Sequence, residues 1–243
     1  MKRLRLFSTS TVFGGAYLDY CADEVRAFFA GAPTILFVPY ALHDRDTYAA
    51  RARARFAELG LALESIHAER TPEAARRAVE RADGLFVGGG NTFRLLNELY
   101  AQKLIEPVRS RVNDGLRYMG SSAGSNVACI SIKTTNDMPI VYPPSFDALG
   151  LVPFNINPHY MDPDPTSKHM GETREQRIHE FHEMNAPPVV GLREGAWIGV
   201  EGDAITLRGK PGARVFRRGE APQELADGAR LDVLAVSGSK SAS

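Results

Sequence analysis

Short apolar runs alternate with longer charged, alanine-rich segments through the first half of the chain. Residues 4–8, 34–40 and 61–66 have the apolar composition of buried strands, and residues 45–59 have the spacing of an amphipathic helix that Gly60 ends. Strands that are buried on both faces belong to parallel sheets that helices cover on each side. The pattern therefore predicts an α/β fold with a mostly parallel central sheet.

The alternation continues around two glycine-containing turns. Thr71, which proline follows, can cap the start of a helix that we expect to run to about residue 82. Residues 84–93 form a strand that runs into a triple-glycine turn, and residues 92–100 continue as a helix. Residues 117–128 repeat this architecture, with a serine at the apex of the turn.

The second half of the chain is rich in proline. A mostly irregular path is expected after residue 131, because proline removes a backbone donor and fixes its own φ. A helix over residues 173–184, a strand over residues 189–192 and short antiparallel strands over residues 196–216 follow. A long irregular path of this kind usually forms a functional site or packs against one. The prolines are Pro139, Pro143, Pro144, Pro153, Pro158, Pro163 and Pro165.

The chain is long and apolar enough to form one sizeable core, with 243 residues of which 44% are hydrophobic. We expect a single domain over residues 1–236 and a disordered tail over residues 237–243. Lys plus Arg and Asp plus Glu balance at 29 each, so the chain lacks the basic field that a nucleic-acid binder needs. The expected partner is a small molecule.

The two cysteines, Cys21 and Cys129, belong to no cluster with metal-ligand spacing. We therefore expect no metal, no cofactor, and free thiols of the kind found in a reducing cytoplasm. Arg5 interrupts the apolar stretch near the N-terminus, unlike the core of a secretory signal. No window approaches the roughly 20 apolar residues of a membrane-spanning helix. These features predict a soluble, cytoplasmic protein.

Residues 120–124 read Gly-Ser-Ser-Ala-Gly and match the GxSxG nucleophile elbow, whose glycines allow a sharp turn from strand to helix. Such a turn would expose the Ser122 hydroxyl at one end of the sheet, with the Ala123 amide beside it. A five-residue match is weak alone. The apolar lead at residues 116–119 and a helix start at residues 126–129 supply the expected context. The competing interpretation is a tight turn with a capping serine.

A serine hydroxyl needs a neighbouring base, which a carboxylate usually orients. His159 ends a short strand in a proline-fixed turn that would hold an imidazole in place, and His169 is the second candidate. The orienting acid is Asp137 or Glu194, and the residues alone do not choose between them. The competing interpretations are a structural histidine and ordinary turn carboxylates. The other histidines have the charged surroundings of solvated side chains: His43, His67, His179 and His182.

A second glycine turn, residues 88–90, closes another strand just before Asn91. Gly89 and Gly90 would bring a backbone amide opposite that of Ala123, so that the amides form an oxyanion hole. The alternative is a phosphate-binding loop, because a glycine turn that opens a helix also binds anions. The turn lacks the Lys-Ser/Thr end of a P-loop and does not match GxGxxG, which favours the oxyanion hole.

Together these segments resemble peptidase E, a family of cytoplasmic aspartyl dipeptidases that release N-terminal aspartate. The resemblance covers most of the chain. It depends on several blocks in one order, which is far more specific than any single motif. The blocks are VGGGNTF (87–93), GSSAGSN (120–126), TTNDMPI (134–140), FDALGLVPFNINPHY (146–160), GETREQRI (171–178) and GLREGAWI (191–198).

The resemblance implies a three-layer α/β sandwich, similar to class I glutamine amidotransferases, with a mostly parallel central sheet. It also implies a serine-type peptidase with Ser122 as nucleophile and His159 as its base. It favours Glu194 as the acid that orients the histidine, and Asp137 stays a charge-relay candidate.

The chain departs from the family pattern beside the nucleophile. Ser121 stands where a bulky aromatic residue is expected, and Ser125 stands where alanine is expected. Ser121 is therefore an alternative nucleophile to test, and the walls of the pocket are expected to differ.

An aspartyl dipeptidase has to bind a side-chain carboxylate and a free ammonium group, so it needs a cation and an anion near the nucleophile. Arg174 is the cation candidate, because guanidinium binds carboxylate with two hydrogen bonds, and Arg177 shares its helix face. Glu172 or Asp137 would meet the ammonium group, and Asn91 is a further candidate contact. The competing interpretation of Arg174 and Glu172 is an ordinary ion pair at a helix start.

The expected reaction is hydrolysis of the peptide bond after an N-terminal aspartate, through an acyl-enzyme and without a metal. We expect a monomer or homodimer that binds neither nucleic acid nor membrane. One alternative is a cyanophycinase-like peptidase, which shares this fold and serine site but cuts β-aspartyl-arginine polymer. Another is a non-catalytic module that holds a small anion in the glycine turns. Comparing α-aspartyl with β-aspartyl substrates separates the two peptidases, and ligand binding without turnover would indicate the module.

Overall fold

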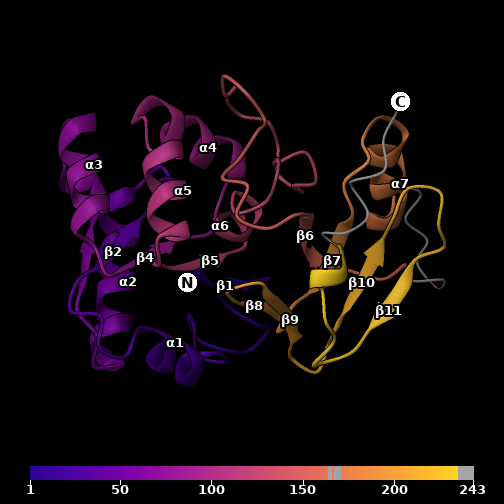
Figure 1. Cartoon of the computed structure of the whole chain (residues 1–243), viewed down its shortest axis with the longest axis horizontal. Helices are drawn as coiled ribbons and strands as arrows, with labels where there is room; N and C mark the ends of the chain where they lie inside the picture. Colours follow the sequence, from indigo (N-terminus) through magenta and orange to yellow (C-terminus); the bar gives the residue numbers. More distant parts are fainter. Residues whose placement is uncertain (164–165, 167–170, 235–243) are drawn as a thin grey trace.

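The central sheet has seven strands in the order β3-β2-β4-β5-β1-β8-β9 in the computed structural model (Figure 1). The first five in this order are parallel, whereas β8 and β9 are antiparallel to their neighbours. The structure describes residues 1–163, 166 and 171–234. The prediction of a mostly parallel central sheet is confirmed. Its strands are β1 (Arg3–Phe7), β2 (Ile35–Val38), β3 (Leu63–Ser65), β4 (Gly84–Val87), β5 (Arg117–Ser121), β8 (Trp197–Glu201) and β9 (Ala204–Arg208).

Helices cover both faces of this sheet, as Figure 1 shows. Alternate residues of a strand point to opposite faces, so Phe37 and Phe86 pack with α1 and α2. Leu36 and Val87 pack on the other face with α3, α4 and α5. The expected three-layer sandwich is confirmed. The helices are α1 (Ala22–Phe29), α2 (Arg45–Glu58), α3 (Pro72–Arg81), α4 (Thr92–Ala101) and α5 (Ile105–Asn113).

The helices that carry clear capping signals begin where the sequence predicts. The Thr71 hydroxyl accepts a hydrogen bond from the amide of Ala74, with Pro72 in the first turn of α3. Helix α2 ends before Gly60, whose φ of 75° is one that glycine adopts without strain. Helices α1 and α5 were not predicted from the sequence, and neither has a side-chain N-cap hydrogen bond.

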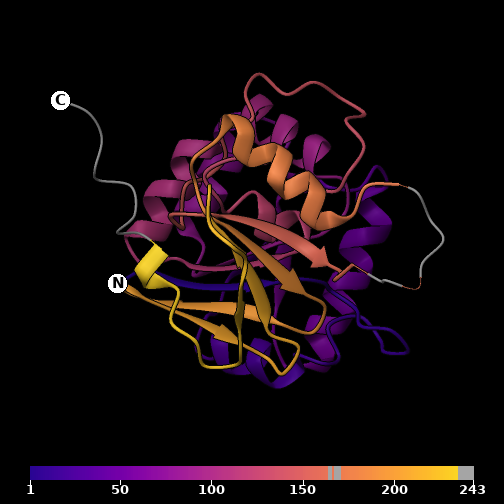
Figure 2. The same cartoon turned by 90° about the vertical axis from the view of Figure 1, so that its right-hand side faces the viewer.

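A second, smaller sheet lies beside the first, with the order β11-β10-β7-β6 (Figure 2). β6 and β7 are parallel, and β10 and β11 join them antiparallel. The predicted antiparallel strands near the C-terminus are confirmed, but they divide between the two sheets. Thr173 begins α7 with a reciprocal capping box. The elements are β6 (Asn155–Tyr160), β7 (Val189–Arg193), β10 (Ala213–Phe216), β11 (Gln223–Leu225) and α7 (Arg174–Met184).

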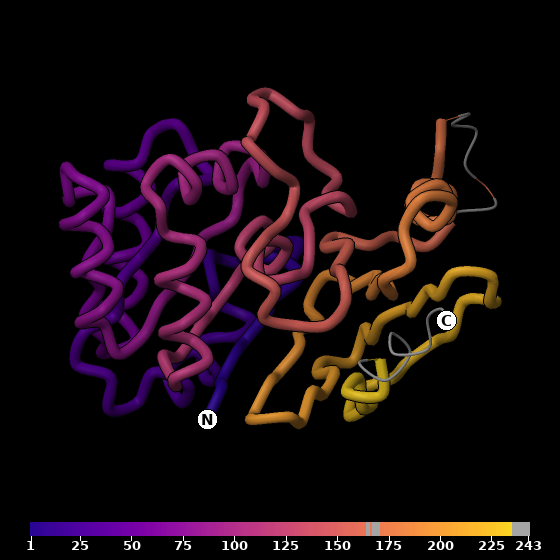
Figure 3. Tube along the Cα trace, turned by 45° about the horizontal axis from the view of Figure 1, so that its top comes forward, coloured from indigo at the N-terminus to yellow at the C-terminus, as the bar shows by residue number. Residues whose placement is uncertain are grey.

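An irregular path connects the two halves of the fold. It follows the one-turn helix α6 (Ala123–Asn126) and lies between the helical layer and the second sheet in Figure 3. The expected helix start at residues 126–129 is wrong: the helix begins at Ala123 and ends at Asn126, and the chain then pairs Ser131 with Asp147. The predicted irregular path after residue 131 is confirmed up to β6.

The largest apolar cluster joins both sheets. It includes Leu6 and Val87 from the central sheet and Ile156 and Leu192 from the second sheet. One apolar core therefore extends across the two sheets. Among residues 1–163, 166 and 171–234, no helix has the length and apolar character needed to cross a bilayer. The tail expected over residues 237–243 lies outside the described residues.

Candidate active site

The turn after β5 gives Ser122 the geometry of a nucleophile elbow. Ser122 has φ 52° and ψ −109°, a backbone conformation that serine rarely adopts, and α6 begins at the next residue. A Cβ on Gly124 would overlap the Val87 carbonyl oxygen, and one on Gly120 would lie 2.5 Å from the Gly124 carbonyl oxygen. Both glycines of the motif are therefore required by close backbone contact.

His159 lies in a β-bulge of β6. The pairing register with β7 shifts between Pro158 and Tyr160, and His159 itself has φ 53°. A bulge re-aims a side chain out of the regular alternation of a strand. Here the imidazole Nε2 lies 2.9 Å from the Ser122 hydroxyl oxygen, so the structure brings together the two residues that the sequence analysis paired.

Glu194, directly after β7, reaches the other side of the same ring. Its Oε1 lies 2.6 Å from His159 Nδ1. An ionised carboxylate only accepts hydrogen bonds, so Nδ1 carries the proton and Nε2 of the neutral ring is free to accept from the Ser122 hydroxyl. The resulting order along the hydrogen bonds is Ser122, His159, Glu194.

Asp137 has a different environment. Its Oδ2 accepts hydrogen bonds from the Thr92 amide at 2.7 Å, the Thr92 hydroxyl at 2.6 Å and the Thr135 hydroxyl at 3.1 Å. A carboxylate is favoured at the N-terminus of a helix, where free amides and the helix dipole meet. Within the described part of the chain, Asp137 anchors the start of α4 and makes no hydrogen bond to His159.

The glycine turn after β4 lies against the nucleophile. A Cβ on Gly89 would come within 3.2 Å of the Ser122 Cβ, and Gly90 has φ 134°. Burial raises the pKa of the Tyr48 hydroxyl, and a hydrogen bond from the Gly89 amide opposes this shift. The Gly89 amide thus faces Tyr48, and the amides of Gly90 and Ala123 remain the candidates for an oxyanion hole.

Both polar atoms of the Asn91 side chain make hydrogen bonds within the protein. Its Oδ1 accepts from the amide of Arg94 at 3.0 Å and caps α4, and its Nδ2 donates to the Met138 carbonyl at 2.9 Å. These contacts tie the glycine turn to the loop that carries Asp137. Asn91, which was expected to contact the substrate, therefore also holds the glycine turn in place.

Arg174 begins α7 as a partly buried cation. Burial lowers its pKa, the neighbouring Arg177 lowers it further, and Asp137 opposes the shift. Its buried Nε has no hydrogen-bond partner among the described residues. The expected alternative, an ion pair of Arg174 with Glu172, is not the pairing observed: Glu172 lies 3.4 Å from Arg177 instead.

Sequence reasoning missed the side chains that hold the free edge of β6. Asn126 and Thr134 donate to the Ile156 carbonyl at 2.8 and 2.9 Å, and Asn136 donates to the Pro158 carbonyl at 2.7 Å. They replace a neighbouring strand and link the strand of His159 to the segment after Ser122. The motifs GSSAGSN and TTNDMPI contained these residues, but only the fold assigns them this role.

Comparison with known proteins identifies the family. Residues 4–208 match the sequence profile of peptidase family S51. The chain belongs to peptidase family S51. The resemblance stated from the sequence is confirmed, and the protein is a serine-type peptidase.

Relatives of this S51 peptidase match over nearly their whole length. The peptidase E of Streptomyces coelicolor is 54% identical over 231 residues, which cover 95% of this chain and 94% of that protein. A probable alpha-aspartyl dipeptidase of Drosophila melanogaster is 48% identical over 236 residues, with 96% and 97% covered.

Solved structures share the fold of the S51 peptidase at low sequence identity. A putative peptidase E from Listeria monocytogenes superposes with a TM-score of 0.65 at 23% identity, covering 86% of this chain and 98% of that one. A peptidase from an acI-B1 Actinobacterium superposes with a TM-score of 0.68 at 18% identity, covering 95% and 96%.

The two serines that depart from the family pattern are both buried. The Ser121 hydroxyl has no hydrogen-bond partner among the described residues. The Ser125 hydroxyl lies 2.7 Å from the Phe7 carbonyl and 2.9 Å from the Gly120 carbonyl. Ser122 is thus the serine of this group that contacts a histidine. The second candidate base, His169, lies outside the described residues.

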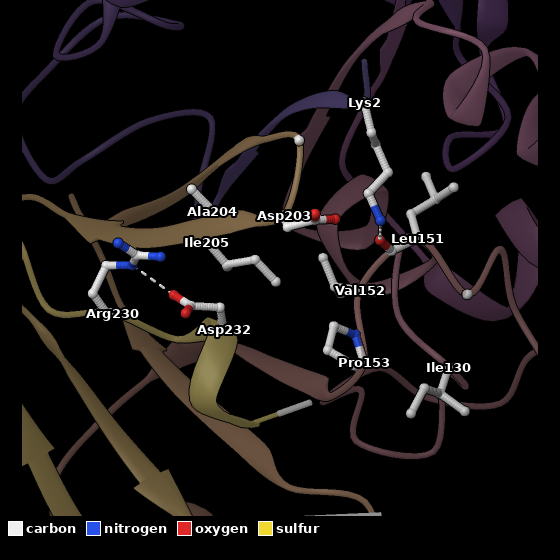
Figure 4. Close-up of a pocket in the computed structure, with 12 residues that line it drawn as sticks. Lys2, Ile130, Leu151, Val152, Pro153, Asp203, Ala204, Ile205, Arg230 and Asp232 are labelled. Carbon is white, nitrogen blue, oxygen red and sulfur yellow. Dashed lines mark hydrogen bonds and ion pairs between the residues drawn. The ribbon is translucent and has the colours of Figure 1, made fainter. Parts of the chain in front are cut away.

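A cavity of about 630 Å³ lies away from these residues (Figure 4). Lys2 and Asp203 line it at the end of β1 opposite Ser8, and the Lys2 ammonium donates to the Leu151 carbonyl at 2.8 Å. None of the residues that the sequence analysis assigned to the site lines this cavity. Among the described residues, no group of three or more His, Cys, Asp or Glu side chains could hold a metal ion.

Proposed function

We propose that this S51 peptidase hydrolyses Asp-Xaa dipeptides, with Ser122 as nucleophile, His159 as general base and Glu194 as the acid that orients the histidine. The observation that carries the proposal is the His159 ring, which bridges Ser122 at 2.9 Å and Glu194 at 2.6 Å. The names of the relatives, peptidase E and probable alpha-aspartyl dipeptidase, support the substrate.

The reaction follows from the direction of these hydrogen bonds. His159 Nε2 takes the Ser122 proton while the serine oxygen attacks the carbonyl carbon of the aspartyl residue, and Glu194 stabilises the imidazolium that forms. The amides of Gly90 and Ala123 stabilise the negative oxygen of the tetrahedral intermediate. His159 then protonates the leaving amine as the carbon–nitrogen bond breaks. Water, deprotonated by the same ring, hydrolyses the aspartyl ester and restores Ser122.

Substrate recognition uses the opposite charges of Arg174 and Asp137. Arg174 binds the side-chain carboxylate of the substrate, which supplies a partner for a cation that is partly buried. Asp137 meets the free ammonium group, because its carboxylate is held at the start of α4 close enough to influence Arg174. Glu172 and Arg177 pair with each other and contribute less.

We also propose that the enzyme works in the cytoplasm and does not bind nucleic acid. Cys21 and Cys129 are free and buried, which suits a reducing cytoplasm. The balanced charge of 29 acidic and 29 basic residues gives no field for nucleic acid. Fractionation of cells that express the protein with a C-terminal tag tests the location: recovery with a membrane or secreted fraction would contradict it.

A panel of four peptides tests the substrate. We expect rapid hydrolysis of Asp-Leu and much slower hydrolysis of Glu-Leu, N-acetyl-Asp-Leu and β-aspartyl-arginine. These three peptides change, in turn, the length of the first side chain, the free amine and the α-linkage that the site is proposed to recognise. EDTA should leave the rate unchanged, since the serine, histidine and glutamate supply the nucleophile. Faster cleavage of β-aspartyl-arginine would favour a cyanophycinase-like activity, and binding of Asp-Leu without turnover would favour a binding module.

A further inference from the structure

The bulge that aims His159 leaves its own amide without a strand partner. Pro158 pairs with Leu192 and Tyr160 pairs with Arg193, so His159 is the extra residue between them. Its φ of 53° lies outside the range of a regular strand residue. A buried amide needs a hydrogen-bond acceptor, and in this bulge the acceptor has to come from another element.

Ser8 supplies that acceptor. Its hydroxyl oxygen accepts from the His159 amide at 2.9 Å and donates to the Leu192 carbonyl at 2.7 Å. These directions are unambiguous, because an amide only donates and a carbonyl only accepts. Ser8 is fully buried, and its own amide donates to the Ala196 carbonyl at 3.2 Å.

The same stretch of chain also supports the nucleophile. Ser8 follows the last residue of β1, Phe7, whose carbonyl accepts from the Ser122 amide at 3.0 Å. Leu192, whose carbonyl accepts the hydrogen bond from the Ser8 hydroxyl, lies in β7 two residues before Glu194. One short segment therefore contacts the backbones that carry Ser122, His159 and the approach to Glu194.

We propose that Ser8 is a positioning residue for the catalytic relay: its hydroxyl fixes the histidine bulge against both the nucleophile turn and the strand that leads to Glu194. Only a small side chain that both donates and accepts can bridge the two backbone groups at this buried position. Alanine would leave the His159 amide and the Leu192 carbonyl unpaired, and the bulge would move to satisfy them. The kinetic readout of this inference rests on the proposed function.

The test compares Ser8→Ala with Ser125→Ala, which is a matched control. Ser125 is also a fully buried serine whose hydroxyl contacts two backbone carbonyls, but it makes no contact with His159. For Asp-Leu hydrolysis we expect Ser8→Ala to lower kcat about 10- to 100-fold with KM within about twofold of wild type, because misplacing a base by about 1 Å costs rate rather than binding. We expect Ser125→Ala to keep kcat within about threefold.

Crystal structures of wild type and Ser8→Ala give a readout that needs no substrate. We expect the distance from His159 Nε2 to the Ser122 hydroxyl to lengthen beyond hydrogen-bonding range in Ser8→Ala. If Ser8→Ala does not fold, Ser8→Cys keeps a similar volume but a weaker donor and acceptor, and its kcat should then fall about three- to tenfold.

The outcomes separate the two proposals. A wild type that does not cleave Asp-Leu contradicts the proposed function, while the crystal structures still test Ser8. A folded Ser8→Ala or Ser8→Cys with wild-type kcat, or a Ser8→Ala structure with the histidine unmoved, overturns the role of Ser8. Equal losses of kcat in Ser8→Ala and Ser125→Ala also overturn it, because they would indicate a general effect of losing a buried hydroxyl.

Discussion

Replacing Glu194 with glutamine removes one charge and keeps the size of the side chain. The carboxylate lies 2.6 Å from His159 Nδ1, where the imidazolium forms during the reaction. Two unit charges about 4 Å apart at an effective dielectric constant of about 20 interact by about 4 kcal/mol. That energy corresponds to about a thousandfold in rate. Both side chains are partly exposed, at 36% and 46%, so solvent screening lowers the expected loss in kcat to about 10²- to 10³-fold.

The assay measures kcat and KM of Asp-Leu hydrolysis near neutral pH, with Asp137→Asn as the matched control. The asparagine carbonyl can still accept the hydrogen bonds that Thr92 and Thr135 donate. We therefore expect a loss of about tenfold or less, mainly in KM, because the group that meets the substrate ammonium loses its charge. A Glu194→Gln enzyme with near wild-type kcat, together with an inactive Asp137→Asn, would refute the assignment of the orienting acid.

Three further changes test other parts of the account. Arg174→Gln should raise KM for Asp-Leu about 10- to 100-fold with the free energy of unfolding nearly unchanged, whereas Arg177→Gln should stay within about twofold; equal effects would contradict the substrate assignment. Gly124→Ala should lower the free energy of unfolding by about 3 kcal/mol in a urea titration, because its Cβ overlaps the Val87 carbonyl oxygen; wild-type stability would show that the turn can relax. Burial lowers the pKa of His182 from 6.5, so the unfolded chain binds more protons and stability should fall as pH drops through 6.5; His182→Gln should flatten this dependence, and an unchanged slope would assign it to other groups.

The elements with strong local signals could be predicted from the sequence. The Thr71 cap and Gly60 stop gave two helices within one or two residues of their observed ends. Helices α1 and α5 lack side-chain caps, so their boundaries carried no comparable signal. The C-terminal strands divide between two sheets according to how they pair in the folded protein. The alternation of apolar and polar residues predicts a strand but does not say which strand it pairs with.

The part of the candidate site that a local sequence motif determines could be predicted. The glycines around Ser122 predict the nucleophile elbow, because a Cβ added at either glycine would clash with backbone atoms. The residues alone do not choose between Asp137 and Glu194, since both stand at the ends of extended segments, and the contact of Glu194 with His159 is seen only in the fold. Ser8 carried no signal at all: a lone serine after a strand acquires its role only when β1, β6 and β7 meet.

The most direct test of the account compares Asp-Leu hydrolysis by Ser122→Ala and Ser121→Ala. Both serines stand in the same turn, but the Ser122 hydroxyl contacts His159 and the Ser121 hydroxyl is buried without a partner among the described residues. We predict that Ser122→Ala lowers kcat by roughly 10⁴-fold or more, as loss of a nucleophile does, and that Ser121→Ala stays within about tenfold of wild type. An active Ser122→Ala beside an inactive Ser121→Ala would contradict the central claim.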